Sequence, residues 1–123
     1  NHHLISHHRE DAQLMSQKAR IDTHHMRLLN YFLERMRDTP DGDGSLLDHS
    51  MILFGSNMSN SDLHNNDPLP SAVLGRGYGR LKGGQHLHYP QDTPHANLLL
   101  TLLERAGIPV PALGNSTGVL TEA

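Results

Sequence analysis

The sequence predicts an α/β fold in which two buried strands and two amphipathic helices belong to a larger, mostly parallel sheet flanked by helices. Residues 50–55 (SMILFG) and 71–75 (SAVLG) are short, continuous apolar runs, which are typical of strands covered on both faces. Two helices are too few to cover both faces of such a sheet, and the chain begins with Asn1 rather than Met. We therefore expect residues 1–123 to be the C-terminal portion of a single α/β domain whose N-terminal part is absent from this chain.

The two helices are predicted from periodicity and from their end signals. The first is expected over residues 11–37, before the proline- and glycine-rich stretch DTPDGDG. Its apolar residues recur at helical spacing: Leu14, Ile21, Leu28, Leu29, Phe32, Leu33 and Met36. The second is expected from Thr93 as N-cap, with Pro94 at its first position, to Gly107. The stretch HLHYP is expected to form a short edge strand, and the C-terminal tail is expected to be irregular.

Composition excludes several classes of function. The 123 residues carry 10 Lys and Arg against 13 Asp and Glu, a net charge of −3, which gives no electrostatic case for nucleic acid or an anionic membrane. No apolar run approaches the roughly 20 residues of a membrane span. The absence of cysteine excludes disulfides, iron–sulfur clusters and thiolate zinc sites. The 11 histidines should make the charge of the protein sensitive to pH near neutrality.

The N-terminal stretch HLISHH is the first candidate site. Neutral imidazole binds zinc, copper, nickel and iron, and a site needs three or four converging ligands. In a helix, His3 and His7 would share a face, whereas in an extended chain Ser6 and His8 would share one. Either conformation offers at most two ligands at once, so another must come from elsewhere. His64 is the best candidate, because it lies in the loop directly after a buried strand. The alternative is a polar network in which these histidines bond backbone groups around a turn.

The same stretch resembles the signature of the HXXSHH family, a bacterial domain of unknown function named for this motif. Downstream segments resemble that family too: TPDGDGSLLDHSMILFGSNMS, HNNDPLP, LKGGQHLHYP and DTPHANLLLTLLERAGIPV. The resemblance covers essentially the whole chain. It implies an exported, periplasmic bacterial protein, with the N-terminal remainder of the same protein as the partner of this chain. A further protein partner is left open.

A weaker resemblance points to alkaline-phosphatase-like and sulfatase-like proteins, whose order of elements is similar. It implies an alkaline-phosphatase-like sheet and metal-assisted hydrolysis of a phosphate or sulfate ester. Carried over, Ser6 and His8 stand at an Asp and a His ligand, the stretch GSNMS stands at an acidic motif, and His64 stands at the last histidine. Neither Ser6 nor GSNMS offers a carboxylate, which argues for one histidine-held metal or for none. The nucleophile of that superfamily would lie upstream of this chain.

Two functions follow. The favoured one is a metal site built from His3, His7, His8 and His64, with zinc as the first choice of divalent ion and iron or copper as alternatives. The rival is a non-catalytic module that uses its surface for interaction, which the missing carboxylates favour. The substrate stays open.

Three further groups receive structural interpretations. His25 is interpreted as a core histidine, with the alternative that it is a neighbour of the ligands if its helix packs beneath the site. His49 is expected to organise the turn beside Asp48. The glycine-rich GRGYG is interpreted as a tight turn rather than a dinucleotide fingerprint. An anion site is possible at the basic residues that follow the second apolar run, although a solvated loop is preferred: Arg76, Arg80 and Lys82.

Overall fold

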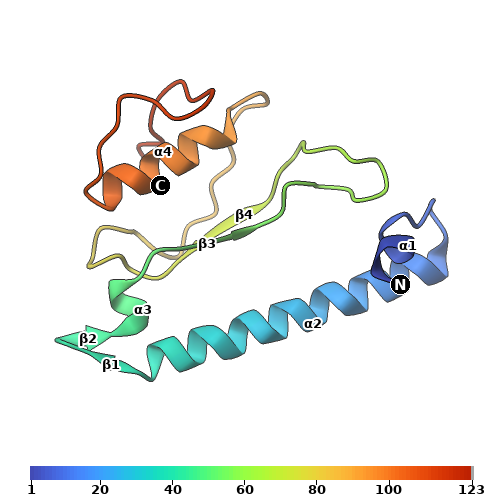
Figure 1. Cartoon of the computed structure of the whole chain (residues 1–123), viewed down its shortest axis with the longest axis horizontal. Coiled ribbons are helices and arrows are strands. Elements are labelled where there is room, and N and C mark those ends of the chain that lie inside the picture. Colours follow the sequence, from blue (N-terminus) through green and yellow to red (C-terminus); the bar gives the residue numbers. More distant parts are fainter. Residues whose placement is uncertain (123) are drawn as a thin grey trace.

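The structure is a computed structural model that describes residues 1–122. Its elements, in chain order, are α1 (His2–Ser6), α2 (Ala12–Arg37), β1 (Pro40–Asp41), β2 (Gly44–Ser45), α3 (Leu46–His49), β3 (Ile52–Gly55), β4 (Ser71–Leu74) and α4 (His95–Arg105). In Figure 1, α2 runs along the lower edge, the β3–β4 pair crosses the middle, and α4 lies above it with the C-terminal tail. The short helix α1 packs on the N-terminal end of α2.

The long helix α2 confirms the prediction for residues 11–37. Asp11 is its N-cap, and the Asp11 side chain accepts a hydrogen bond of 2.8 Å from the amide of Leu14. The helix ends at Arg37, where the positively charged last turn suits the negative end of the helix dipole. No side chain of α2 is buried, so this helix lies on the surface for its whole length.

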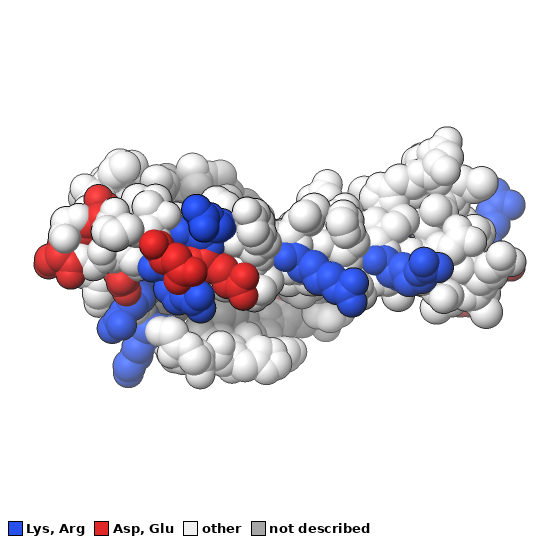
Figure 2. Space-filling view, turned by 90° about the horizontal axis from the view of Figure 1, so that it is seen from below, with Lys and Arg blue, Asp and Glu red and all other residues white. Residues whose placement is uncertain are grey.

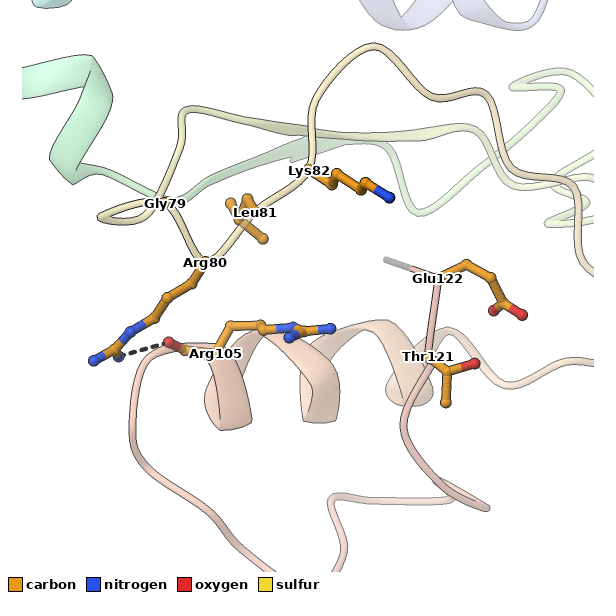
Figure 3. A pocket seen from close by; sticks show the side chains of 7 residues that line it. All are labelled: Gly79, Arg80, Leu81, Lys82, Arg105, Thr121 and Glu122. Atoms are coloured by element: carbon orange, nitrogen blue, oxygen red, sulfur yellow. Dashed lines mark hydrogen bonds between the residues drawn. The ribbon is translucent and has the colours of Figure 1, made fainter.

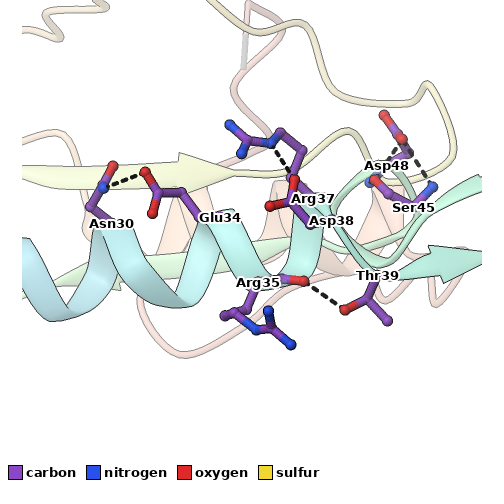
Figure 4. A network of polar contacts seen from close by, with 8 residues as sticks. All are labelled: Asn30, Glu34, Arg35, Arg37, Asp38, Thr39, Ser45 and Asp48. Carbon is purple, nitrogen blue, oxygen red and sulfur yellow. Dashed lines mark hydrogen bonds and ion pairs between the residues drawn. The ribbon is translucent and has the colours of Figure 1, made fainter.

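Short-range hydrogen bonds set the direction of the chain between α2 and α3 (Figure 4). The hydroxyl of Thr39 donates to the carbonyl of Arg35 at 2.6 Å, which closes the end of α2. Ser45 and Asp48 form a capping box at the start of α3: the Ser45 hydroxyl donates to the Asp48 carboxylate at 2.6 Å and accepts from the Asp48 amide at 3.2 Å. The hydrogen bonds from Ser45 hold the pKa of the Asp48 carboxyl below its usual value.

The prediction of an alkaline-phosphatase-like, mostly parallel sheet is wrong. Strands β3 and β4 pair antiparallel, with Ile52 opposite Leu74 and Gly55 opposite Ser71, and the other sheet is the small antiparallel pair of β1 and β2. The chain between β3 and β4 contains no crossover helix, and parallel neighbours would need such a connection. The first apolar run is also only half covered: in β3 the exposed residues Leu53, at 38%, and Gly55 alternate with the less exposed Ile52 and Phe54.

The edge strand expected for HLHYP is wrong as well, because residues 86–90 form no strand. The second helix is confirmed with a shifted start. Helix α4 begins at His95 with Pro94 as its N-cap, whereas the hydroxyl of Thr93 donates to the carbonyl of Pro90 at 2.7 Å. The chain turns after the helix at Gly107, whose φ of +80° is the left-handed conformation that glycine adopts readily.

The core of the molecule lies between α4 and the C-terminal tail. Leu100 of α4 is 5% exposed and Leu120 of the tail is 9% exposed. The buried hydroxyl of Thr101 accepts a hydrogen bond from the amide of Leu120 and donates to the carbonyl of Asn97, both at 2.7 Å. The side chain of Asn97 in turn accepts from the amide of Thr117 at 2.8 Å. The tail is therefore irregular, as predicted, but it is fastened to α4 by buried polar bonds.

Helix α2 leaves part of its apolar stripe exposed. Leu28 is 53% exposed and Phe32 is 47% exposed, although both lie on the same helical face as Ile21 and Met36. Figure 2 shows acidic and basic side chains side by side near the C-terminal end of α2, and separate basic side chains toward its N-terminal end. Within residues 1–122, no helix combines the length and the apolar content that crossing a membrane requires.

Candidate functional site

Three of the four predicted ligands form a row of imidazoles at the N-terminal end of the molecule. The ring centroids of His3 and His7 are 4.6 Å apart at an interplanar angle of 73°, and those of His7 and His64 are 4.8 Å apart at 85°. His3 lies in α1 and His7 is the C-cap residue of that helix, and the amide of His7 donates to the carbonyl of His3, so the two rings lie on one side as in the helical alternative of the sequence prediction. We call His3, His7 and His64 the histidine row.

Two hydrogen bonds bring the loop after β3 onto α1. The hydroxyl of Ser61 donates to the carbonyl of Ser6 at 2.9 Å, across 55 residues of sequence. The amide of Arg9 donates to the carboxylate of Asp62 at 3.1 Å. These bonds hold the loop against α1 at the point where His64 meets His7. His64 adopts a φ of +53°, a conformation that few residues other than glycine adopt.

Ser6 and His8 have backbone partners instead of a place in the row. The hydroxyl of Ser6 donates to the carbonyl of His3 at 2.8 Å. Ser6, which stands at an Asp ligand in the alkaline-phosphatase-like resemblance, therefore bonds the backbone at the end of α1. The Nδ1 atom of His8 accepts a hydrogen bond of 3.2 Å from the amide of Glu10 in the turn before α2. Among the described residues, no ring contact joins His8 to the histidine row. The polar-network interpretation therefore describes Ser6 and His8 better than the ligand interpretation.

The row fits a metal in donor type and spacing but not in orientation. Zinc lies about 2.0–2.1 Å from imidazole nitrogen, so tetrahedral ligands would place neighbouring ring centres about 5 Å apart. The two centroid distances of 4.6 and 4.8 Å are close to that spacing. However, the rings stand edge to face, and within residues 1–122 no group of three or more His, Asp or Glu is arranged to hold a metal ion. Ring rotation would be needed, and the exposed positions of His3 and His64 leave room for it.

The interpretation of His25 as a core histidine is wrong, because its side chain is exposed. Helix α2 does pack against α1, as the alternative for His25 required. The rings of His2 and His25 meet edge to face, with their centroids 6.4 Å apart. His25 thus contacts the residue that precedes His3 rather than the row itself.

His49 is the centre of a second arrangement, whose partners sequence reasoning missed. Its Nδ1 lies 2.9 Å from a carboxylate oxygen of Asp41, and its Nε2 lies 3.1 Å from one of Asp43. The ring of Tyr78 stacks on it at a centroid distance of 4.1 Å and an angle of 2°. His49 does organise this turn, but with Asp41 and Asp43 rather than with Asp48. The sequence could have indicated these partners, because DGDGS places carboxylates on either side of one glycine, a few residues before His49.

The charged form of His49 suits this arrangement. Neutral imidazole carries one N–H donor, whereas imidazolium donates from both nitrogens and so satisfies both carboxylates. The hydrogen bond with Asp41 raises the pKa of His49, and the charges of Asp41, Asp43 and Asp48 act in the same direction. The contribution of this group to stability is complete below the unfolded-state pKa of about 6.5 and is lost as the pH rises through the raised folded-state pKa.

We expect the Asp41→Asn variant to reveal this dependence. The difference in melting temperature between wild type and Asp41→Asn should be largest near pH 6 and should shrink as the pH rises to about 8.5, because His49 loses its charge in both proteins. Thermal unfolding followed by circular dichroism at half-unit steps of pH measures it. The comparison cancels the titration of the other histidines. A difference that stays constant over this range would contradict the charged pair.

The basic loop after β4 does not assemble the anion site considered from the sequence. A hollow of about 250 Å³ is lined by Gly79, Arg80, Leu81, Lys82, Arg105, Thr121 and Glu122 (Figure 3). Arg80 donates from Nη1 to the carbonyl of Arg105 at 2.9 Å, which ties the loop to the end of α4. Glu122 places a carboxylate among the cations, and Arg76 does not line the hollow. These features favour a structural role for Arg80.

Comparison with protein-family models, with curated protein sequences and with solved structures finds no match for this chain. The resemblances to the HXXSHH family and to alkaline-phosphatase-like proteins stay predictions from the sequence, and the candidate site is defined by the geometry of the histidine row.

Proposed function

We propose that the histidine row binds one divalent transition metal, with zinc as the first choice and iron or copper as alternatives. The observation that supports it is the meeting of three imidazoles from two distant segments: His3 on α1 with its C-cap residue His7, and His64 on the loop after β3. The hydrogen bonds from Ser61 and Arg9 hold these segments together without using the rings. The imidazole nitrogens of the row can therefore serve as ligands once the rings rotate. His8 would join them only by giving up the hydrogen bond from the amide of Glu10.

The chemistry of this proposal is hydrolysis of a phosphate or sulfate ester. A divalent metal held by neutral imidazoles keeps its full charge, so when bound it would activate water and stabilise the charge that develops on the ester oxygens. The residues of the row would hold the ion, and Ser6 would brace α1 through the carbonyl of His3. Membership of the HXXSHH family and export to the periplasm belong to the same proposal, supported by the HLISHH motif.

The second candidate is a non-catalytic interaction module. The exposed apolar side chains of α2 favour it, since Leu28 and Phe32 lie on one helical face without burial. Large exposed apolar areas mark contact surfaces more often than single exposed residues do. A protein partner, such as the N-terminal remainder of the same protein, would cover this face.

Metal binding is the test that separates the two. Purified protein dialysed against zinc should retain about one equivalent by elemental analysis, and excess zinc should raise the melting temperature, since a ligand at 100 times its Kd stabilises the folded state by about 2.7 kcal/mol. His7→Ala should abolish both effects, because His7 is the middle member of the row. His86→Ala is the matched control, an exposed histidine on a loop elsewhere in the chain.

Two results would overturn the metal proposal. One is the absence of retained zinc, iron or copper in folded wild-type protein. The other is zinc retention that is equal in wild type and His7→Ala. A protein that binds zinc but does not hydrolyse p-nitrophenyl phosphate or sulfate would keep the metal site and reject the hydrolase.

A further inference from the structure

Ser71 and His95 form a pair outside the histidine row. Ser71 is the first residue of β4 and His95 is the first residue of α4. The Oγ atom of Ser71 and the Nε2 atom of His95 are 3.1 Å apart, within hydrogen-bond distance. Both residues are exposed, so a solute can reach them. A hydroxyl beside an imidazole is the arrangement in which the imidazole can take the proton of an attacking serine.

Gly55 leaves the space in which the Ser71 hydroxyl lies. Gly55 is opposite Ser71 in the β3–β4 pair. A Cβ atom at Gly55 would lie 3.1 Å from the Oγ of Ser71 and 3.2 Å from the carbonyl oxygen of Pro70. Because such contacts are tighter than usual, a larger residue would push the hydroxyl from its present place. Glycine at this position therefore leaves the Ser71 hydroxyl its present place beside His95.

The pair borders an open hollow of about 440 Å³, a volume within the range of about 300–1,000 Å³ typical of small-molecule sites. Its lining consists of Leu53, Gly55, Ser56, Asn57, Asn66, Leu69, Ser71 and His95. The two leucines offer an apolar surface, and Asn57 and Asn66 carry side-chain amides that can donate hydrogen bonds to an oxyanion. No Lys, Arg, Asp or Glu belongs to this lining, which suits an uncharged substrate better than a phosphate or sulfate ester.

We propose that Ser71 and His95 act as nucleophile and general base on small, uncharged carboxylic esters. The Ser71 oxygen attacks the carbonyl carbon while its proton passes to Nε2 of His95. The tetrahedral intermediate expels the alkoxide, which takes that proton and leaves as the alcohol. Water, deprotonated by His95, then attacks the acyl-serine, releases the carboxylic acid and returns the proton to Ser71. Atoms and charge balance without a cofactor.

The pair is a dyad rather than a triad. Within residues 1–122, no carboxylate lies within ion-pair distance of His95, so no Asp or Glu side chain there orients the imidazole ring. Removing the orienting Asp from a serine–histidine–aspartate triad lowers turnover by about 10⁴. Slow turnover is therefore expected, and covalent capture of Ser71 is a sharper measurement than steady-state hydrolysis.

An alkyl fluorophosphonate is the probe for this site. The Ser71 oxygen forms a bond to phosphorus, fluoride leaves, and the hydroxyl proton passes to His95 and then to solvent. Intact-protein mass spectrometry should show one adduct per chain, and peptide mapping should place it on Ser71. Ser71→Ala should lose the adduct, and His95→Gln should form it at least about 100 times more slowly, as for loss of a general base.

Two controls make the result specific. Ser59→Ala removes an exposed serine of the loop after β3 that does not line the proposed site, and should leave the rate of labelling unchanged. Labelling should also persist in EDTA and in the His7→Ala variant, which separates this site from the histidine row. Absence of the adduct in wild-type protein with the expected circular dichroism, or an equal adduct in Ser71→Ala, would overturn the proposal.

Discussion

Replacing Gly75 by alanine is expected to destabilise the protein by about 3 kcal/mol or more. Gly75 has a φ of +93°, in the left-handed region that costs an L-residue about 1–2 kcal/mol. A Cβ atom there would also collide with the carbonyl oxygen of Ser50 and would lie 3.0 Å from that of Leu47. Both oxygens belong to the backbone at the end of α3, so neither can move aside as a flexible side chain would.

Gly79→Ala is the matched control for this prediction. Gly79 has a similar φ of +79°, but a Cβ atom there would have no neighbour within 4 Å. The control therefore carries the conformational cost alone, about 1–2 kcal/mol. Urea denaturation followed by circular dichroism measures both variants. If Gly75→Ala is unfolded in buffer, titration with trimethylamine N-oxide restores the folded state and yields its free energy. Equal costs for the two variants would show that the collision with α3 is absent.

The close approach at Gly75 has a structural purpose. Directly after it, the amide of Gly77 donates to the carbonyl of Ser50 and the amide of Tyr78 donates to that of Asp48, both at 2.9 Å. These bonds lay the loop on α3 and place the ring of Tyr78 over His49. The interpretation of GRGYG as a tight turn is confirmed, since the amide of Arg80 bonds the carbonyl of Gly77 at 3.2 Å.

Local patterns predicted the two longer helices, α2 and α4, but missed the short helix α3 and failed for the sheet. The spacing of apolar residues and the cap at Asp11 are properties of one segment, and α2 follows them within a residue at either end. Strand pairing depends on how the intervening chain returns. An apolar run such as SMILFG is equally compatible with a strand covered on both faces and with a half-covered strand. Leu53 shows that the second case holds, because it points out of the β3–β4 pair.

In the candidate sites, too, contacts set by local sequence spacing were predicted, whereas contacts set by turns were missed. The contact between His3 and His7 follows from their helical spacing. His64 was chosen because open α/β sheets place ligands in the loop after a buried strand, and it meets His7 although β3 belongs to an antiparallel pair instead. His8 was expected as a ligand because it stands at a His ligand in the alkaline-phosphatase-like resemblance, yet the turn before α2 directs its ring to the amide of Glu10. The pairs His49–Asp41 and Ser71–His95 join turns and element ends, so no periodicity indicated them.

Replacing Leu100 by alanine is expected to cost about 2–5 kcal/mol, the usual range for a buried leucine. Leu100 is one of two buried apolar residues within the part of the chain that the structure describes, and the other, Leu120, lies on the tail that packs against α4. Few other apolar contacts would compensate for the cavity. We expect the tail to open first, so hydrogen exchange at the amide of Leu120, which bonds the hydroxyl of Thr101, should accelerate more than exchange within α2.

The same substitution at Leu28 is the control. Leu28 also lies in a helix but is 53% exposed, and alanine has the higher helix propensity, so Leu28→Ala should change stability by no more than about 0.5 kcal/mol. Urea denaturation compares the two variants directly. A large cost at Leu28 would mean that α2 is covered in solution, by a second copy or by a rearranged loop. A small cost at Leu100 would mean that α4 and the tail do not form the stable part of the molecule, since burial is what makes the leucine side chain contribute.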